Sequence, residues 1–177
     1  ILATEVTTEA NDVQQLQPML TKAQAMVELL LGEDEVLGAA AADAGYWSEE
    51  NAASQTEECE LFIATRQDRK QRAELRDAAP PRGRMPKGLS VRGRMQRKLR
   101  TKRGRAIYAQ RGASVEPVFG QMKDRQGAGQ FSMRGLGACQ GEWHLHAAVH
   151  NLRKLHRDSV RRRAAGSQMA GKQADKA

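Results

Sequence analysis

Large apolar side chains are scarce in this chain. Leu, Val, Ile and Phe together account for 30 of the 177 residues, and aromatic residues make up 4%. So few of these residues can form only a small core, and we expect loose segments around it. The length fits one domain or slightly more.

Cysteine and long hydrophobic runs are also nearly absent. Cys59 and Cys139 form no Cys-x-x-Cys pair, which argues against a disulfide scaffold and against a thiolate zinc site. No apolar run approaches the roughly 20 residues of a membrane helix, so no membrane partner is expected. Residues 1–10 contain no Lys or Arg, unlike a signal peptide. Because residue 1 is Ile, we expect the natural chain to begin upstream.

Charge is divided unevenly along the chain. Residues 1–60 contain 13 acidic residues and a single basic one, Lys22, whereas residues 61–177 contain 28 basic and 8 acidic residues. The whole chain carries a formal charge of +8. This asymmetry indicates an acidic part beside a part that binds a polyanion, most simply a nucleic acid.

The densest basic segment is residues 82–105, which hold 11 Lys or Arg and no acidic residue. Glycines and a proline inside it make one regular helix unfavourable. Two interpretations remain open: a segment that neutralises phosphates by releasing counterions, or a solvated, flexible linker. The lack of a local acidic residue favours the first.

Local signals in the first part of the chain predict alternating strands and helices. The β-rich residues 1–8 predict a strand. An apolar stripe from Val13 to Leu30 predicts a helix that begins near Pro18 and ends at Gly32.

Residues 35–43 are ambiguous, because four consecutive Ala favour a helix whereas the short segment between Gly38 and Gly45 suits a buried strand. We prefer the strand, and predict another at residues 61–65, with a helix start at Ser48 between them. Residues 105–110 are expected to be helical and to end at Gly112.

The C-terminal part is expected to be helical. Ser114 is predicted to cap a helix that has Glu116 in its first turn, and an apolar face predicts a last helix over residues 137–156. The order of elements indicates an α/β fold with helices over a sheet.

Two acidic residues are candidates for chemistry. Asp43 follows a predicted strand, where ligand sites of α/β sheets collect, although an Asp that begins a turn is the commoner case. Glu116 shares a helix face with Lys123, an arrangement suited to a site for a metal and a phosphate. It suits a solvated helix start equally well, because the macrodipole favours a carboxylate there.

The spacing of Tyr108, Arg111, Glu116 and Lys123 resembles the Tyr–Arg–Glu–Lys signature of DDE-type transposases of bacterial insertion sequences. The surrounding sequence, YAQRGASVEPVFGQMK, carries most of this similarity. The segments AADAGYWSEEN and ILATEVTTEANDVQQLQPML extend it toward the N-terminus.

The resemblance implies a ribonuclease-H-like fold, a mixed sheet flanked by helices on which three carboxylates converge. It assigns Asp43 as the second catalytic Asp and Glu116 as the final Glu. The family's first catalytic Asp would lie upstream of Ile1, so the fold is expected to be incomplete at its N-terminus. Residues 1–156 would then be the C-terminal part of the catalytic domain. Residues 66–105 would be a basic insertion or linker, and residues 157–177 a basic, disordered tail.

The resemblance also implies metal-dependent DNA cleavage followed by strand transfer, with Asp43 and Glu116 holding Mg²⁺ or Mn²⁺. The implied partners are element ends and target DNA, on which the protein could form a homo-oligomer, in the nucleoid of a bacterial cytoplasm. Alone, this chain is expected to be inactive. Candidate DNA-binding residues are Arg111, Lys123, Arg134, Arg92, Arg94, Arg97, Lys98, Arg100, Lys102 and Arg103.

Two other functions compete with this one. A catalytically dead transposase remnant would keep DNA affinity without cleaving. A basic RNA-associated protein would explain the charge but not the signature around Glu116.

Overall fold

The computed structural model describes residues 1–174, with side chains as far as residue 165. The chain divides into two compact units. The sheet unit comprises Leu2 and residues 7–119, and the C-terminal unit comprises Ile1, residues 3–6 and the chain from Gly120 onward.

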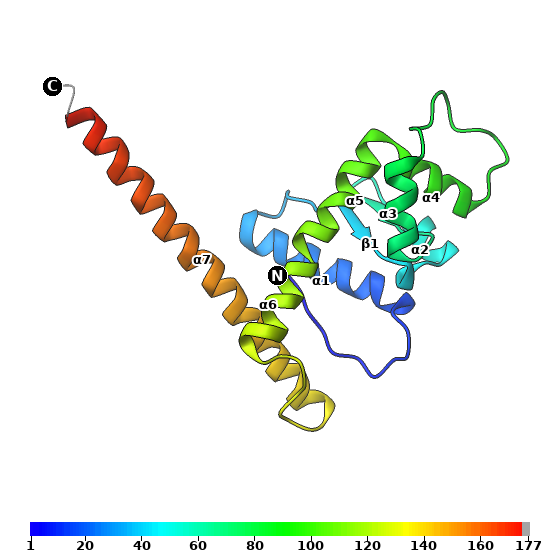
Figure 1. Ribbon diagram of the computed structural model, residues 1–177. Coiled ribbons are helices and arrows are strands. Elements are labelled where there is room, and N and C mark those ends of the chain that lie inside the picture. Colours follow the sequence, from blue (N-terminus) through cyan, green and yellow to red (C-terminus); the bar gives the residue numbers. More distant parts are fainter. Residues whose placement is uncertain (175–177) are drawn as a thin grey trace. The chain divides into compact units, whose positions relative to one another are not determined.

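The helices and strands of the sheet unit are drawn in Figure 1, in which a long loop joins α3 to α4. In chain order they are η1 Val13–Gln15, α1 Leu16–Leu31, β1 Gly38–Ala42, η2 Ala44–Tyr46, α2 Glu49–Ala53, β2 Cys59–Ile63, α3 Asp68–Asp77, α4 Val91–Arg100 and α5 Lys102–Ser114. Helix α6, Glu116–Gln126, begins in this unit and continues into the C-terminal unit, which also contains α7, Leu136–Ala174.

The sheet consists of two parallel strands. β1 pairs with β2 in a register that runs from Gly38 opposite Cys59 to Ala42 opposite Ile63. The connection between them holds η2 and α2, as a parallel pair requires a crossover. The architecture is therefore a mixed, helix-dominated α/β arrangement, and the expected α/β class is confirmed. Within residues 1–174 no third strand joins the sheet, which is smaller than the expected mixed sheet.

The core lies around β2. Leu61, Phe62 and Ile63 are each at most 1% exposed, as expected for a strand of a parallel sheet covered on both faces. Leu75 of α3 and Leu99 of α4 pack into the same cluster. Helices α1, α3, α4 and α5 each contribute apolar side chains to this cluster.

Several local predictions are confirmed. Residues 35–43 contain β1, and residues 61–65 overlap β2. Gly32 ends α1 with φ of 127°, a conformation that favours glycine, and its N–H donates to the carbonyl of Glu28. The side chain of Ser48 caps α2 by accepting a hydrogen bond from the Asn51 N–H.

The predicted strand at residues 1–8 is wrong. These residues form no strand; part of the segment bonds instead to side chains of α7 within the C-terminal unit. The Val6 N–H donates to Gln140 Oε1 at 2.5 Å, and Gln140 Nε2 donates to the Thr4 carbonyl at 3.4 Å. High β-propensity does not make a strand where no neighbouring strand offers a ladder.

The predicted helix boundaries near residue 112 are also wrong. Helix α5 continues past Gly112 to Ser114, and Val115, which has helical φ and ψ angles, leads directly into α6. Ser114 therefore does not cap α6, and its hydroxyl donates back to the Gln110 carbonyl at 2.7 Å. A chain that stays helical through the junction leaves no helix start to cap.

The last helix is longer than predicted. Helix α7 begins at Leu136 and continues through Ala174, so residues 157–174 are helical where a disordered tail was expected. Residues 175–177 of that expected tail lie outside the described residues. None of the described helices has the length and apolarity needed to cross a membrane.

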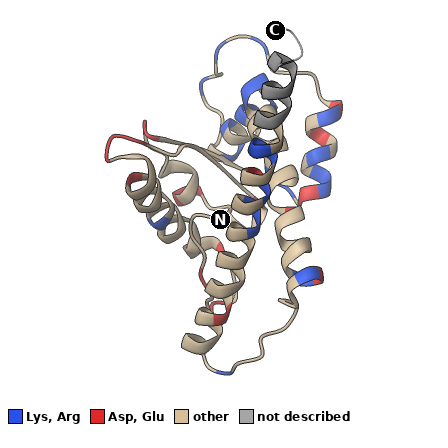
Figure 2. Cartoon of the chain, turned by 90° about the vertical axis from the view of Figure 1, so that its left-hand side faces the viewer, with Lys and Arg blue, Asp and Glu red and all other residues tan. Residues whose placement is uncertain are grey.

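Residues 66–105, expected to be an insertion or linker, are built into the sheet unit. Helices α3 and α4 bury Leu75, Met95 and Leu99 in its core. The turn between α4 and α5 lies at Thr101, so the expectation that residues 82–105 do not form one helix is confirmed. The long loop between α3 and α4 is clear in Figure 1, and Figure 2 shows how Lys and Arg are distributed on the chain.

Candidate active site

Asp43 stands directly after β1. Its side chain caps η2 by accepting a hydrogen bond from the Gly45 N–H at 2.9 Å. This is the turn role that the sequence context predicts. The carboxylate remains 41% exposed, and its other oxygen contacts Arg111 Nη2 at 3.3 Å. Capping therefore occupies one oxygen and leaves the other for an ion pair.

Glu116 is the first residue of α6, where the helix macrodipole favours a carboxylate. It forms an ion pair with Arg72 of α3, and its side chain is 57% exposed. An ion pair that is so open to water is weak and exchanges readily. The hydrogen bond to Glu116 raises the pKa of Arg72.

Arg111 connects Asp43 to α3. The arginine projects from α5, and only 14% of its side chain is exposed. Its Nη1 contacts Asp68 Oδ1 at 3.0 Å, while its Nη2 contacts Asp43. A guanidinium presents several donors in a rigid fork, so one arginine can serve two carboxylates at once.

Asp68, the first residue of α3, links these pairs into one network. Its Oδ1 accepts hydrogen bonds from Arg111 and from the Tyr108 hydroxyl, both at 3.0 Å, and its Oδ2 contacts Arg72 Nε at 2.8 Å. Burial and the hydrogen bond to Asp68 raise the pKa of Tyr108. Arg72 in turn reaches Glu116. We call Asp43, Asp68, Arg72, Tyr108, Arg111 and Glu116 the carboxylate–arginine network.

Gly112 lets Arg72 lie close to α5. A Cβ at this position would stand 3.0 Å from Arg72 Nη2 and 3.2 Å from its Cζ. The guanidinium therefore lies against the helix backbone where no side chain intervenes. This gives Gly112 a packing role in the middle of a helix, where the sequence suggested an end.

The network offers ligands of the type that a divalent cation prefers, but too few of them come together. Asp43 and Glu116 supply partly exposed carboxylate oxygens, the ligands that Mg²⁺ and Mn²⁺ prefer. Each now has an arginine as its counter-charge, which a cation would have to replace. Among residues 1–174, no group of three metal-ligating side chains is assembled.

The other predicted DNA-binding residues have varied surroundings. Lys98 and Arg103 pair with Glu60, and Arg92 lies over the Trp47 ring. Arg94, Arg97 and Arg100 donate to backbone carbonyls, and Lys102 is exposed.

Lys123 and Arg134 belong to the C-terminal unit. Lys123 lies on α6, seven residues after Glu116, as predicted.

Sequence reasoning missed Asp68 and Arg72. Asp68 stands shortly after β2 and in the first turn of α3, the same kind of position that made Asp43 a candidate. Two acidic residues after two adjacent parallel strands lie at the same edge of a sheet. That signal was present, but it required the helix over residues 68–77 to be recognised.

Comparison with known proteins agrees with the signature. Residues 84–156 match the model of a protein family described as "Transposase DDE domain". The matched segment contains Arg111 and Glu116 and ends before α7 does, whereas Asp43 and Asp68 precede it. No curated protein and no solved structure matches the chain. The match covers less than half of the chain and supports a relationship of residues 84–156 to the DDE transposases.

Proposed function

We propose that this chain is part of the catalytic domain of a DNA transposase, in which Asp43 and Glu116 are metal-binding carboxylates. One observation carries the proposal. Asp43 and Glu116 are far apart in the sequence, yet both belong to one network of ion pairs. The family match includes Glu116 and agrees with this assignment.

The reaction that fits is metal-dependent cleavage of a DNA phosphodiester and transfer of the freed strand end to target DNA. Bound Mg²⁺ or Mn²⁺ would supply an activated water and stabilise charge on the leaving oxygen. Asp43 and Glu116 would hold the cation, and Arg111 would bind a phosphate oxygen once Asp43 turns away from it. The ribonuclease-H-like fold, the insertion-sequence origin and the bacterial nucleoid location belong to the same proposal, as does oligomerisation on DNA.

Basic residues around the α3–α4 loop would hold the DNA backbone. Arg97 donates to the carbonyls of Arg82, Gly83 and Arg84, and Arg100 donates to that of Ala79. A carbonyl carries no net charge, so these arginines keep their full positive field. Contacts of this kind fix DNA in place without reading its sequence.

The test is nicking of supercoiled DNA that carries the element ends, in Mg²⁺ or Mn²⁺, by the full-length protein that contains this chain. Glu116→Gln should reduce nicking by at least about 100-fold, because a carboxylate that holds the cation contributes several kcal/mol. Asp124→Asn is the matched control, since it removes one charge from the same helix, and it should nick as the parent does. Nicking that survives Glu116→Gln would refute the assignment.

A second function rests on the basic segment alone. Residues 82–105 hold 11 Lys or Arg and no acidic residue, a charge that would also suit a transposase remnant that binds DNA without cleaving it. DNA retention that weakens steeply with salt, without nicking by the full-length protein, would establish this alternative. Binding that is insensitive to salt would contradict both functions.

A further inference from the structure

Asp68 makes more contacts than any other carboxylate of the network. Its two oxygens accept from Tyr108, Arg111 and Arg72 at 2.8 to 3.0 Å. A carboxylate has about four acceptor positions, so Asp68 uses most of them on three donors. Asp43, by comparison, meets Arg111 at 3.3 Å and spends its other oxygen on a turn.

Arg72 and Arg111 therefore each have two carboxylate partners: Asp68, which they have in common, and a second, more exposed carboxylate. Asp68 holds Arg111 from the side of α3, and it holds Arg72 across one helical turn. Asp43 and Glu116 meet the same arginines through more exposed carboxylates. If the two exposed carboxylates exchange their partners, the arginines still have Asp68.

We propose that Asp68 is a positioning residue, which keeps Arg72 and Arg111 in place to bind DNA phosphate when Asp43 and Glu116 take a divalent cation. This inference rests on the function proposed above and adds a residue to it. Asp68 itself is neither a cation ligand nor a contact to DNA. It acts through the two guanidinium groups, and the Tyr108 hydroxyl of α5 donates to it as well.

The direction in which DNA affinity changes when Asp68 loses its charge distinguishes a positioning role from a purely electrostatic one. A carboxylate near DNA repels phosphate, so removing its charge should strengthen binding if nothing else changes. Loss of two positioned arginines should weaken it. Asp68→Asn is thus expected to bind a short DNA duplex in Mg²⁺ about tenfold more weakly than the parent chain, in a fluorescence-anisotropy titration.

Asp77→Asn is the matched control. Asp77 is the last residue of α3, is 63% exposed and pairs with its neighbour Arg76. The variant removes the same charge from the same helix but leaves the network intact. It should bind DNA as tightly as the parent chain or more tightly.

Two further measurements exclude a general loss of structure. Asp68→Asn should increase the reaction of Arg72 and Arg111 with phenylglyoxal, read by mass spectrometry without DNA, whereas Asp77→Asn should not. In a chain that already carries Arg72→Gln and Arg111→Gln, adding Asp68→Asn should weaken DNA binding no further. Additional weakening in that background would overturn the proposal, because Asp68 would then act by another route.

The outcomes distinguish this inference from the proposed function. If Asp68→Asn binds DNA as tightly as Asp77→Asn while the parent protein nicks DNA, Asp68 is not a positioning residue and the transposase assignment stands. If the parent chain binds no DNA at all, the proposed function and the phosphate-binding role fail together. The phenylglyoxal pattern would still report whether Asp68 holds the arginines.

Discussion

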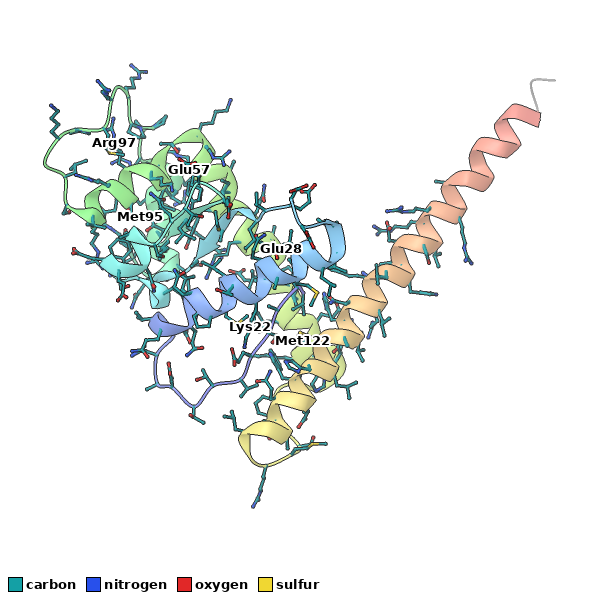
Figure 3. The ribbon with its side chains drawn as sticks, turned by 180° about the vertical axis from the view of Figure 1, so that it is seen from behind. Lys22, Glu28, Glu57, Met95, Arg97 and Met122 are labelled. Atoms are coloured by element: carbon teal, nitrogen blue, oxygen red, sulfur yellow. The ribbon has the colours of Figure 1, made fainter. Side chains whose placement is uncertain are left out.

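Arginines of the sheet unit meet two kinds of partner. In the carboxylate–arginine network, Arg72 and Arg111 pair with acidic side chains. At the α3–α4 loop, Arg97, Arg100 and Arg105 donate to backbone carbonyls instead. Figure 3 shows Arg97 at this loop. Paired charges cancel at a distance, whereas a carbonyl leaves the charge of its arginine uncancelled.

This difference separates two tasks. The loop arginines hold a loop in shape and still attract a polyanion, since their positive charge reaches solvent. The network arginines pair with carboxylates, and in the proposed function they would become available to phosphate only when those carboxylates bind a cation. Helix α5 carries Arg105 of the loop group and Arg111 of the network, so the position of this helix sets the position of both arginines.

Gly104 allows α5 to take that position, and replacing it should have the largest effect. A Cβ there would lie 2.2 Å from the Lys98 carbonyl oxygen and 2.8 Å from that of Leu99. These are backbone atoms that cannot move aside alone. Gly104→Ala should therefore lower the free energy of unfolding by about 3 kcal/mol, measured by urea denaturation.

Gly120→Ala provides the control for that variant. Gly120 lies inside α6, and nothing stands within 4 Å of an added Cβ. Alanine should there stabilise the helix by up to about 1 kcal/mol. Equal effects of the two substitutions would show that the α4–α5 junction is looser than the structure describes.

Thr101 fixes the start of α5, and its loss should have a smaller effect. Its hydroxyl oxygen accepts from the Gly104 N–H at 3.0 Å, and the hydroxyl donates to the Lys98 carbonyl at 2.7 Å. Thr101→Ala should cost about 1 kcal/mol of stability, measured by the same denaturation. Thr101→Ser keeps the hydroxyl and should retain most of it; an equal loss in both variants would point to the methyl group.

Local signals predicted the elements that depend on local physics. The strands near residues 38–42 and 59–63, the glycine that ends α1 and the serine that caps α2 all follow from neighbouring residues. Helix α4 was not predicted, although Val91, Met95 and Leu99 recur every fourth residue and form an apolar stripe. The many arginines around them and Gly93 made this stripe hard to recognise.

Partners distant in the sequence were beyond such reasoning. Residues 1–8 have strand propensity but no strand to pair with. No helix was predicted over residues 68–77, so Asp68 was not singled out, and only the fold brings it to Arg111 of α5. Asp43 and Glu116 were assigned roles through the resemblance of their surroundings to the transposase signature, and those catalytic roles stay predictions.

Arg97 offers a way to sharpen the comparison through salt dependence. Each phosphate neutralised by a cation contributes about 0.9 to the slope of log affinity against log salt. Arg97→Gln should reduce that slope for DNA binding by up to about 0.9, because its charge is uncancelled. Arg76→Gln should leave the slope unchanged, since Arg76 already pairs with Asp77. Equal slopes for both variants would contradict the distinction between the two kinds of arginine.

Glu60 cancels two charges of the basic segment and gives the smallest expected effect. Its carboxylate contacts Arg103 Nε at 2.8 Å and Lys98 Nζ at 3.1 Å. Partial burial acts to raise the pKa of Glu60, but the hydrogen bonds from Arg103 and Lys98 outweigh it and lower the pKa below the ordinary 4.5. The pairing therefore stabilises the native state above that pH and is lost as the pH falls through the lowered value.

Glu60→Gln should accordingly be less stable than the parent chain at pH 7 by a fraction of about 1 kcal/mol, because the pair is partly exposed. The difference should shrink below pH 4.5 and vanish in stronger acid, in urea denaturation at a series of pH values. Glu57→Gln removes an exposed charge nearby and should show no such trend. A difference that grows in acid would mean that Glu60 is stabilised in its protonated form, and Lys98 and Arg103 would then belong with the uncancelled cations of the loop.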